Sequence, residues 1–527
     1  MNLEKELKHP VFSIIRQVAG KEKSQTFIVG GFVRDLLLHR PCSDVDCVVI
    51  GDGIKLSRAI CQEIGKQTGH RPELLEFAQF GTCKFHYEDL EVEFVGARKE
   101  TYLPSSRKPV VETGTLEEDQ MRRDFSINAM AISLNDGSFG LVSDPFNGLE
   151  DLEHQTIRVH RDADVSFSED PLRMFRAIRF ASQLFFDIEP QTFDAIVRNA
   201  GRCRILSAER ITEELNKILL SPKPSYGFKL LDAAGLLPIF FPELTALKGV
   251  EVRNGKAHKD NFEHTLEVLD HVAFAGGDLW LRWAALLHDI AKPRTKKFEE
   301  PRGWTFHGHE FAGGKMVPGI FRRFKLPMDE NMRFVKKLVE LHLRPIILAE
   351  DIVTDSAVRR LLFEAGEDID KLMTLAKADI TSKNHEKVVR YRNNFTIVEK
   401  KLKELEEKDR IRNFQPPVSG TDIMEYFGIA PCAEIGIIKT RIKDAVLDGI
   451  IGNNREEAWA MMLRIGEELG LKAASGATEN TQKKEAAPTE NEAKATYGNS
   501  PEEKKPAAAP RPKRKRIVRK PPQHGGL

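Results

Sequence analysis

The hydrophobic pattern near the N-terminus is that of short strands joined by turns and helices. Apolar runs at residues 27–29, 46–50 and 90–95 have the length and composition of strands. Gly30 and Gly31 follow the first run directly and precede a helical pattern, which predicts a tight turn between strand and helix. This part of the chain is therefore predicted to mix α and β structure.

Beyond residue 165 or so the pattern takes a helical period, with few strand signals up to residue 470, as in DPLRMFRAIRFASQL and AERITEELNKILL. From residue 473 on, large apolar residues almost vanish, so that segment cannot offset its ordering entropy and is predicted to be disordered. We expect an α+β chain in which a small mixed sheet is followed by three helical regions and a basic tail. The expected parts are residues 1–160, 161–240, 241–405, 406–472 and 473–527.

The composition is that of a soluble globular protein, because 41% of the 527 residues are hydrophobic and 30% are charged. The first ten residues, MNLEKELKHP, have no apolar core, and no apolar stretch is long enough to cross a bilayer, so we expect neither a secretory signal nor a membrane partner. Six cysteines form no C-x-x-C pair, which is typical of reduced thiols in the cytoplasm. The net charge of +1 hides a basic tail, since residues 504–527 carry nine Lys or Arg and no acidic residue.

Two carboxylates lie one residue apart at the second predicted strand. Asp44 and Asp46 project to the same face, because side chains alternate along a strand, and they repel each other unless a cation lies between them. Glu91 or Glu93, on another apolar strand, could complete a cluster of three carboxylates. Such oxygen ligands suit Mg2+ and phosphoryl transfer at two metal ions. A lone D-x-D pattern is common without a metal, so neighbouring residues must support this interpretation.

The glycine turn beside these carboxylates indicates phosphate recognition. Gly30 and Gly31 leave backbone N–H groups open at the start of the helix FVRDLLL, where a phosphate could approach them. Arg34 on the same helix would add charge-assisted hydrogen bonds. A purely structural turn is the alternative.

A second basic group lies in MRRDFSINAMA, where Arg122, Arg123 and Asp124 precede a predicted amphipathic helix that carries Asn128. Two adjacent arginines would neutralise a triphosphate, and the asparagine could hold a ribose hydroxyl. On its own, the group could equally be a solvated charge cluster.

A third group lies in EDPLRMFRAIRF, where Asp170, Arg173, Arg176 and Arg179 are spaced by three along a predicted helix. A carboxylate and a guanidinium at this spacing could present donors and acceptors to the edge of a base. The alternative is an exposed ion pair between Asp170 and Arg173, with little energetic effect.

In their order and spacing, the motifs GGFVRD, SDVDCVV, RRDFSINAMA, DPFNGLEDL and EDPLRMFRAIRF resemble those of the class II tRNA nucleotidyltransferases and their sister poly(A) polymerases. The resemblance covers roughly residues 10–230. It implies a nucleotidyltransferase head over residues 1–160 and a helical, nucleotide-selecting and RNA-binding neck over residues 161–240. It also implies addition of C, C and A to the 3′ end of tRNA without a nucleic-acid template.

The resemblance implies a role for each matched residue. Asp44 and Asp46 would hold Mg2+, with Glu93 preferred to Glu91 as the third catalytic carboxylate. The other matched residues would contact the incoming CTP or ATP: Gly30, Gly31, Arg34, Arg122, Arg123, Asp124, Asn128, Asp170, Arg173, Arg176 and Arg179. Within that set, Asp170 and Arg173 would pair with the base, because cytosine and adenine both offer an acceptor beside an amino donor.

Histidines and aspartates between residues 257 and 400 form another constellation. Their order and spacing resemble those of an HD-type metallophosphohydrolase of the two-metal kind, with ligands His264, His288, Asp289, His309, His342 and Asp379. Mixed imidazole and carboxylate ligands favour Mn2+, Fe2+, Ni2+, Co2+ or Zn2+. The resemblance implies an HD domain over residues 241–405 with phosphatase or cyclic-phosphodiesterase action. A degenerate HD fold that only holds tRNA is the alternative, although no ligand is missing.

Together these features predict a cytoplasmic CCA-adding enzyme of the HD-containing bacterial type, which uses Mg2+, CTP and ATP and binds tRNA. Residues 406–472 would form a helical tRNA-binding region. Three alternatives share these motifs and stay open: a poly(A) polymerase, an A-adding or CC-adding specialist, and a mainly hydrolytic HD enzyme with an RNA-binding head.

Overall fold

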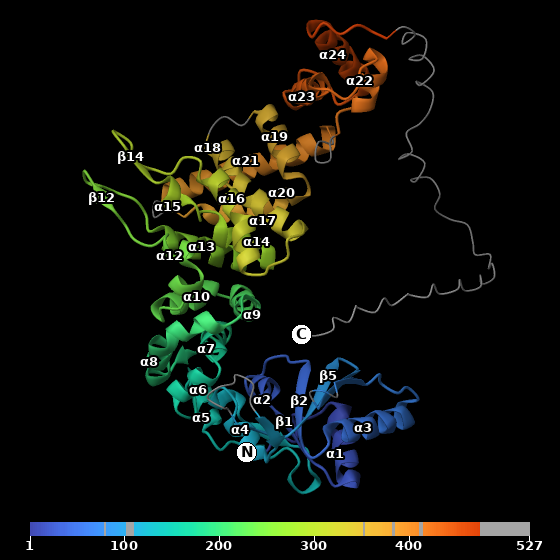
Figure 1. The fold of residues 1–527 in the computed structure, drawn as a ribbon, viewed down its shortest axis with the longest axis vertical. Helices are drawn as coiled ribbons and strands as arrows, with labels where there is room; N and C mark the ends of the chain where they lie inside the picture. The colour runs from blue at the N-terminus through green and yellow to red at the C-terminus, as the bar shows by residue number, and fades with distance from the viewer. Residues whose placement is uncertain are drawn as a thin grey trace, which may run out of the picture. The chain divides into compact units, whose positions relative to one another are not determined.

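The computed structural model describes residues 1–77, 79, 81–101, 110–350, 354–381, 385–409 and 415–474 (Figure 1). The chain divides into two compact units, one of residues 1–415 with 445–452 and one of residues 416–444 with 453–527. The predicted α+β class is confirmed, with a mixed sheet near the N-terminus and helices in most of the remainder. The predicted tail, 473–527, lies outside the described residues except for its first two. In the ranges described, every helix is too short or too polar for a membrane span.

The head is built on a seven-stranded sheet in the order β3-β4-β5-β2-β1-β8-β9. Its strands are β1 (Gln25–Val29), β2 (Asp44–Ile50), β3 (Leu75–Phe77), β4 (Thr82–Tyr87), β5 (Leu90–Gly96), β8 (Ala131–Ser133) and β9 (Val142–Ser143). In this sheet β2 and β5 run parallel, whereas the other neighbouring strands are antiparallel. The three strands predicted from the apolar runs are β1, β2 and β5, and they are adjacent in the sheet.

One face of this sheet is covered by helices α1 (Pro10–Glu22) and α3 (Gly53–Thr68), which pack against each other and against several of its strands. The alternation along β2 turns Val45, Cys47 and Val49 into this core, where all three are buried. The same alternation leaves Asp44 and Asp46 exposed on the opposite face. The core thus fixes the direction in which the acidic pair points.

Further short elements complete the head. They are α2 (Gly31–Leu37), β6 (Arg98–Thr101), β7 (Val110–Thr113), α4 (Leu116–Met121) and α5 (Gly148–Glu153). The prediction of an amphipathic helix carrying Asn128 is wrong, since a single 3-10 turn, Ser126–Asn128, leads directly into β8. Residues 124–134 are all buried, so this segment has no polar face to turn to water as an amphipathic helix would.

The neck is helical, as the periodicity predicts. Its helices are α6 (Ala163–Glu169), α7 (Leu172–Leu184), α8 (Pro190–Asn199), α9 (Ala208–Leu219), α10 (Pro224–Ala233), α11 (Leu237–Phe240) and α12 (Pro242–Thr245). Helix α7 packs against both α9 and α10. Two short strands, β10 (Thr156–Ile157) and β11 (Asp187–Ile188), pair in parallel beside it.

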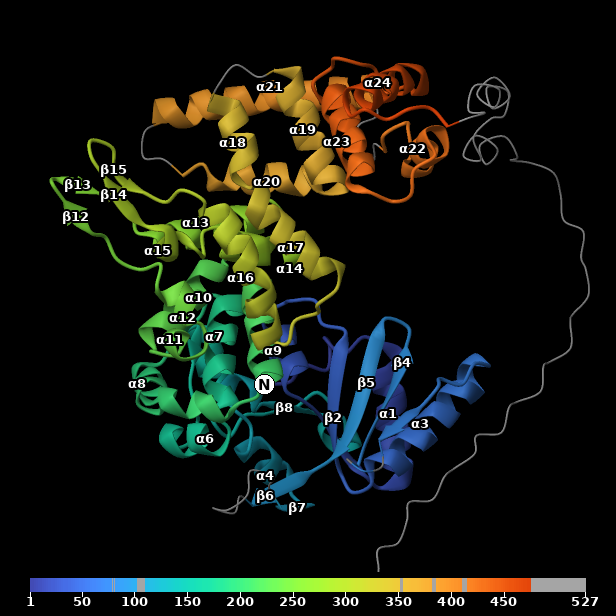
Figure 2. The same ribbon diagram turned by 45° about the horizontal axis from the view of Figure 1, so that its top comes forward.

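The next region is also mainly helical. It contains α13 (Asn261–Phe274), α14 (Leu279–Leu287), α15 (Lys292–Thr295), α16 (His309–Arg323), α17 (Glu330–Leu341), α18 (Leu343–Glu350), α19 (Asp355–Ala365), α20 (Ile369–Asp379) and α21 (His385–Asp409). Two hairpins, which the periodicity does not predict, project side by side from it (Figures 1 and 2). They are β12 (Val252–Arg253) with β13 (Lys256–Ala257), and β14 (Lys297–Glu299) with β15 (Gly303–Thr305).

The C-terminal helices are α22 (Gly420–Phe427), α23 (Ala433–Leu447) and α24 (Arg455–Glu468). A capping box begins α22, because the Ser419 side chain accepts from the Asp422 N–H while the Asp422 carboxylate accepts from the Ser419 N–H. Arg455 then donates to Asp422 at 2.8 Å, which ties the start of α24 to the start of α22. This part of the second unit is therefore fixed by polar contacts as well as by its core.

Candidate active site and metal centre

The acidic side chains predicted to bind metal lie on one face of the head sheet. In the parallel register of β2 and β5, Asp44 lies beside Glu91 and Asp46 lies beside Glu93. Asp44 and Asp46 are exposed, and the two glutamates are half-buried. The fold thus brings together carboxylates that are almost 50 residues apart in the sequence.

The two glutamates differ in their partners on β4. Glu91 accepts a hydrogen bond from Lys84 Nζ at 2.9 Å, and its other oxygen lies 2.9 Å from His86 Nε2. The hydrogen bond from Lys84 is the main reason that the pKa of Glu91 is lowered. Glu93 lies level with Asp46, so its place in the register is the one expected of a third carboxylate.

The donor set of this cluster fits a hard divalent cation such as Mg2+. Although the Asp46 side chain is accessible, the protein atoms packed around it remove part of its hydration and raise its pKa, while the charge of Arg123 lowers the pKa and that of Asp44 raises it further. A bound cation would relieve the repulsion between the aspartates and favour both ionised forms.

Gly30 closes the turn between β1 and α2 next to this cluster. Its φ of 73° lies in the left-handed region that favours glycine. A methyl group at this position would also lie 3.0 Å from Arg123 Nη1 and 3.3 Å from Asp46 Oδ2. A side chain at the predicted phosphate turn would therefore collide with a guanidinium and a carboxylate of the site.

A buried polar network joins the head to the neck. Arg34 binds Asp35 through two hydrogen bonds and donates to Asn128 Oδ1 at 2.8 Å. Asn128 donates in turn to Asp124 at 3.1 Å, and Arg176 Nε donates to the other Asp124 oxygen at 2.7 Å. Burial of Asp124 opposes its ionisation, but the charge of Arg176 and the bond from Asn128 hold the pKa below its ordinary value.

Three of the predicted nucleotide-contacting arginines surround one aromatic ring. The guanidinium carbons of Arg34, Arg176 and Arg179 lie 4.9, 5.4 and 3.9 Å from the centre of the Phe180 ring. Arg179 is buried and lies 2.6 Å from Glu214 of α9. A phosphate contact by Arg179 would therefore have to break a buried ion pair.

Asp170 does not lie on the helix that was predicted to carry it. The residue has an extended conformation and α7 begins at Leu172, after Pro171. A residue that precedes proline is disfavoured in a helix, which explains the difference. The Asp170 carboxylate lies 3.0 Å from Arg210 Nη2 of α9.

Arg173 points back toward the head. It donates to Ser166 Oγ at 2.8 Å and to the backbone oxygen of Arg122 at 2.9 Å. Arg122 and Arg123 share the buried Asp119 carboxylate, one on each oxygen. Asp119 was not predicted from the sequence, although its position three and four residues before these arginines on a helix was an available signal.

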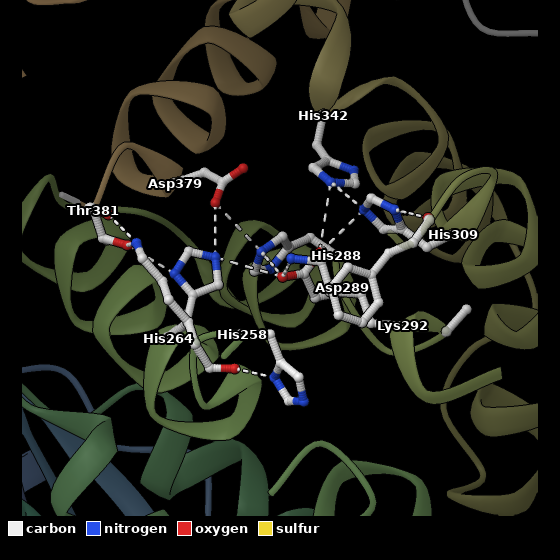
Figure 3. A network of polar contacts seen from close by, with 12 residues as sticks. His258, His264, His288, Asp289, Lys292, His309, His342, Asp379 and Thr381 are labelled. Atoms are coloured by element: carbon white, nitrogen blue, oxygen red, sulfur yellow. Dashed lines mark hydrogen bonds and ion pairs between the residues drawn. The ribbon is translucent and has the colours of Figure 1, made fainter. Parts of the chain in front are cut away.

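The six predicted HD side chains meet at one centre (Figure 3). Most of these residues lie at or directly after the end of a helix. His264 comes from α13, His288 and Asp289 directly follow α14, His309 begins α16, His342 follows α17, and Asp379 ends α20.

Asp289 stands between two pairs of histidines. Its Oδ2 lies 3.4 Å from His264 Nε2 and 3.2 Å from His288 Nε2. Its Oδ1 lies 3.2 Å from His309 Nε2 and 3.9 Å from His342 Nε2. A carboxylate with histidines at both oxygens is suited to bridge two metal ions.

Each of the four histidines uses its Nδ1 for an outer contact and so turns Nε2 toward the centre. Such outer contacts fix the ring and its tautomer in metal sites. The acceptors are Thr381 Oγ1 at 2.8 Å from His264, Ala285 O at 2.7 Å from His288, Phe306 O at 2.8 Å from His309, and Val339 O at 2.7 Å from His342.

The electrostatics of this centre also fit bound cations. Burial opposes a charge on His288, yet Asp289 and Asp379 raise its pKa to about 10. Burial lowers the pKa of His342 to about 4. The buried carboxylates thus stabilise positive charge at this centre, which bound divalent transition ions would supply.

Two further residues at the centre were missed by the sequence analysis. Lys292 Nζ lies 2.5 Å from Asp289 Oδ2, three residues along the chain. Thr381 holds His264 and also lines a groove of about 980 Å3 that reaches the centre. Lys223, Lys229 and Lys259 lie along the same groove.

Family comparisons agree with this division of sites. The model of the poly(A) polymerase head domain matches residues 26–158, and that of a probable RNA-binding site of the polymerase matches residues 185–248. The HD domain model matches residues 261–384.

Curated relatives cover most of the described chain. An A-adding tRNA nucleotidyltransferase of Deinococcus radiodurans is 33% identical over 364 residues, which are 67% of this chain and 80% of that protein. A multifunctional CCA protein of Pseudomonas fluorescens is 36% identical over 309 residues, 57% of this chain and 70% of that protein.

Solved structures share the fold. The CCA-adding enzyme of Bacillus stearothermophilus in complex with CTP has a TM-score of 0.59 at 24% identity, covering 88% of this chain and 99% of that one. The Thermotoga maritima CCA-adding enzyme complexed with tRNA has a TM-score of 0.55 at 20% identity, covering 89% and 99%. Together with the closer sequence relatives, these similarities show that the chain belongs to the family of class II tRNA nucleotidyltransferases and poly(A) polymerases, as a member that carries an HD domain.

Proposed function

We propose that this enzyme adds CCA to the 3′ end of tRNA from CTP and ATP and releases pyrophosphate. The observation that carries the proposal is the register that sets Asp44, Asp46 and Glu93 on one face beside the Gly30 turn. The names of the Pseudomonas and Bacillus relatives support the same reaction.

In this reaction the carboxylates bind and orient the reacting groups. Asp44, Asp46 and Glu93 would hold Mg2+, which when bound activates the 3′ hydroxyl of the primer and steadies the triphosphate. The N–H groups at Gly30 and Gly31 would receive phosphate oxygens. Arg123, already beside Asp46, would balance the charge of the triphosphate.

Base selection would fall to Asp170 and Arg173. Each now has a polar partner, Arg210 for the carboxylate and Ser166 for the guanidinium, so neither is left unpaired before the nucleotide enters. Cytosine and adenine would replace these partners with an acceptor beside an amino donor. Uracil and guanine present the reverse order and would leave buried groups unpaired, which disfavours them.

An A-adding specialist is the second candidate. It is favoured by the match to the Deinococcus enzyme, which covers more of both chains than the match to the Pseudomonas protein. The carboxylate cluster would serve CCA addition and A addition equally. Only an assay of which nucleotides are added can therefore distinguish the two candidates.

One assay separates these candidates. Purified enzyme is given tRNA that lacks CCA, or tRNA that ends in CC, with labelled CTP and ATP singly and together. Three additions to the first tRNA support CCA addition. Addition of A to the second tRNA alone supports the specialist, whereas a long run of A on either tRNA indicates a poly(A) polymerase.

For the HD centre we propose a phosphohydrolase that acts on RNA 3′ ends. Six side chains that would hold metal, the position of Asp289 between two pairs of histidines and the fixed Nδ1 atoms support a working rather than a degenerate site. RNA ending in a 2′,3′-cyclic phosphate or a 3′ phosphate is incubated with Mn2+, Ni2+, Co2+, Fe2+ or Zn2+. The wild type should open the cyclic phosphate or release the 3′ phosphate. The Asp289→Asn variant should lose this activity. An equal rate in the variant would contradict the proposal.

A further inference from the structure

The two hairpins beside the HD centre form a single projecting body. We call it the aromatic arm and define it as residues 251–259 and 296–306. The strands of the two hairpins lie side by side (Figure 2). The arm carries six Lys or Arg against three Glu, so it is basic although the chain is nearly neutral.

Polar contacts tie the hairpins to each other. Trp304 Nε1 donates to the backbone oxygen of Lys256 at 3.2 Å. Near the tips, Asn254 Nδ2 donates to Glu300 Oε1 at 2.5 Å. The arm is thus held as a unit by its own residues, while residues 251–257 stay exposed.

Rings and cations alternate along the arm. Each of three partly exposed aromatic rings has a cation over its face: Arg253 over Phe298 at 4.7 Å, Lys296 over Trp304 at 4.5 Å, and Lys292 over Phe306 at 5.7 Å. His258 lies between the last two rings, edge-on to Trp304 at 5.6 Å and to Phe306 at 5.8 Å. The result is a strip of rings with a cation beside each one, of which Lys296 is also paired with Glu251 at 2.7 Å.

The strip ends at the HD centre. Lys292, the last cation, lies 2.5 Å from Asp289 Oδ2. Phe306, the last ring, accepts from His309 Nδ1 at 2.8 Å through its backbone oxygen. Figure 3 shows His258 close to this cluster. Phe306 thus belongs to the arm and also holds His309, while Lys292, four residues before the second arm segment, contacts both Phe306 and Asp289.

This chemistry fits a single-stranded nucleic acid. Bases stack on aromatic rings regardless of sequence, and a basic track follows the phosphates. Guanidinium and ammonium groups over the rings can turn to the phosphates without leaving the strip. We propose that the aromatic arm binds the single-stranded 3′ end of an RNA and directs its terminal phosphate to the HD centre. This inference rests on the hydrolytic function proposed above.

The test uses the full chain and a short RNA that carries 4-thiouridine near a 2′,3′-cyclic phosphate end. After irradiation, the crosslinked peptides are identified by mass spectrometry, which locates the contact whatever other basic segments bind RNA. We expect crosslinks within residues 251–259 and 296–306. Crosslinks confined to other peptides overturn the proposal.

Variants measure what the arm contributes. Trp304→Ala should weaken binding of this RNA by about tenfold, which is the effect of losing one stacked base, and Arg253→Glu should weaken it by about the same factor because a cation on the phosphate track is reversed. Trp304→Phe keeps a stacking ring and should bind as the wild type does. Lys5→Glu, an exposed charge reversal in the head, is the matched control and should change nothing.

A small chromogenic phosphodiester, bis(p-nitrophenyl) phosphate, checks that the variants remain folded at the centre. Its hydrolysis should be unchanged in both arm variants, while hydrolysis of the RNA falls. An equal loss of both, or unchanged RNA binding, overturns the proposal. Equal competition by polyglutamate would also overturn it, since that would indicate a surface for any acidic polymer.

The two proposals fail differently. If the wild type hydrolyses neither substrate in any metal, the hydrolytic function fails. Crosslinks in the arm would then still show that the arm binds RNA. They would overturn the proposal that it directs the terminal phosphate to the HD centre.

Discussion

Asp46 on β2 lies directly beside Glu93 on β5, whereas Asp44 is level with Glu91. The two glutamates occupy equivalent places on one strand, and Glu91 accepts a hydrogen bond from Lys84 and lies 2.9 Å from His86. This makes them matched positions for mutation.

Glu93→Gln should reduce incorporation of both CMP and AMP by at least about 100-fold, because a charged metal ligand would be lost. Glu91→Gln should change incorporation by less than about threefold, since Glu91 contacts β4 side chains. Single-turnover nucleotide addition measures both. The reverse ranking would assign Glu91 as the third carboxylate.

Asp46→Ala should abolish addition of both nucleotides and leave HD hydrolysis intact. His288→Ala should do the opposite, losing bound metal and hydrolysis while sparing nucleotide addition. Metal content by mass spectrometry and the two activity assays give the comparison. Parallel loss of both activities in either variant would show that the two sites are not independent.

Glu214→Gln should destabilise the neck. Glu214 and Arg179 form a buried pair at 2.6 Å, and removal of one partner leaves the other charge uncompensated, at a cost of about 3 kcal/mol. A lower thermal unfolding midpoint than that of the wild type is expected. Glu213→Gln, on the same helix, is the control. If both variants unfold at the wild-type temperature, this ion pair contributes nothing to stability.

Acid should weaken the contact between α22 and α24. Although burial opposes ionisation, Arg455 and Ser419 lower the pKa of Asp422 to about 2 from a model-compound value of 3.8. A carboxyl whose folded pKa is depressed contributes stability above the unfolded pKa, and this contribution disappears as the pH falls from about 4 toward 2. Asp422→Asn should therefore unfold more easily than the wild type at pH 7, with the difference narrowing below pH 4. A difference independent of pH would contradict the assignment.

The apolar runs were sufficient to predict the central strands, because strands follow local pattern, and the motif spacing was sufficient to name six HD side chains that the fold brings together. The sequence analysis placed Asp170 on a helix and Asn128 on another, and both positions differ. Pro171 in the first case, and complete burial of the segment in the second, override the helical pattern.

The features that were not predicted depend on contacts between residues that are distant in the sequence. The family resemblance implies that Arg179 contacts the incoming nucleotide. Its partner, Glu214, comes from another helix and could not be read from spacing. The arm hairpins were missed for a related reason: their strands are two or three residues long, and contacts between hairpins hold them.

The ring of Phe180 has a consequence for how this enzyme can diverge. Arg34, Arg176 and Arg179 surround this ring. They are candidates for contacts with the nucleotide, and they also take part in the polar contacts that hold the head and the neck together. A change that alters which base is accepted would thereby also loosen the joint that holds the two together. Substitutions that change the nucleotide preference are therefore limited to those that keep the neck folded. We expect compensating changes at Glu214 or Asp124 to accompany them.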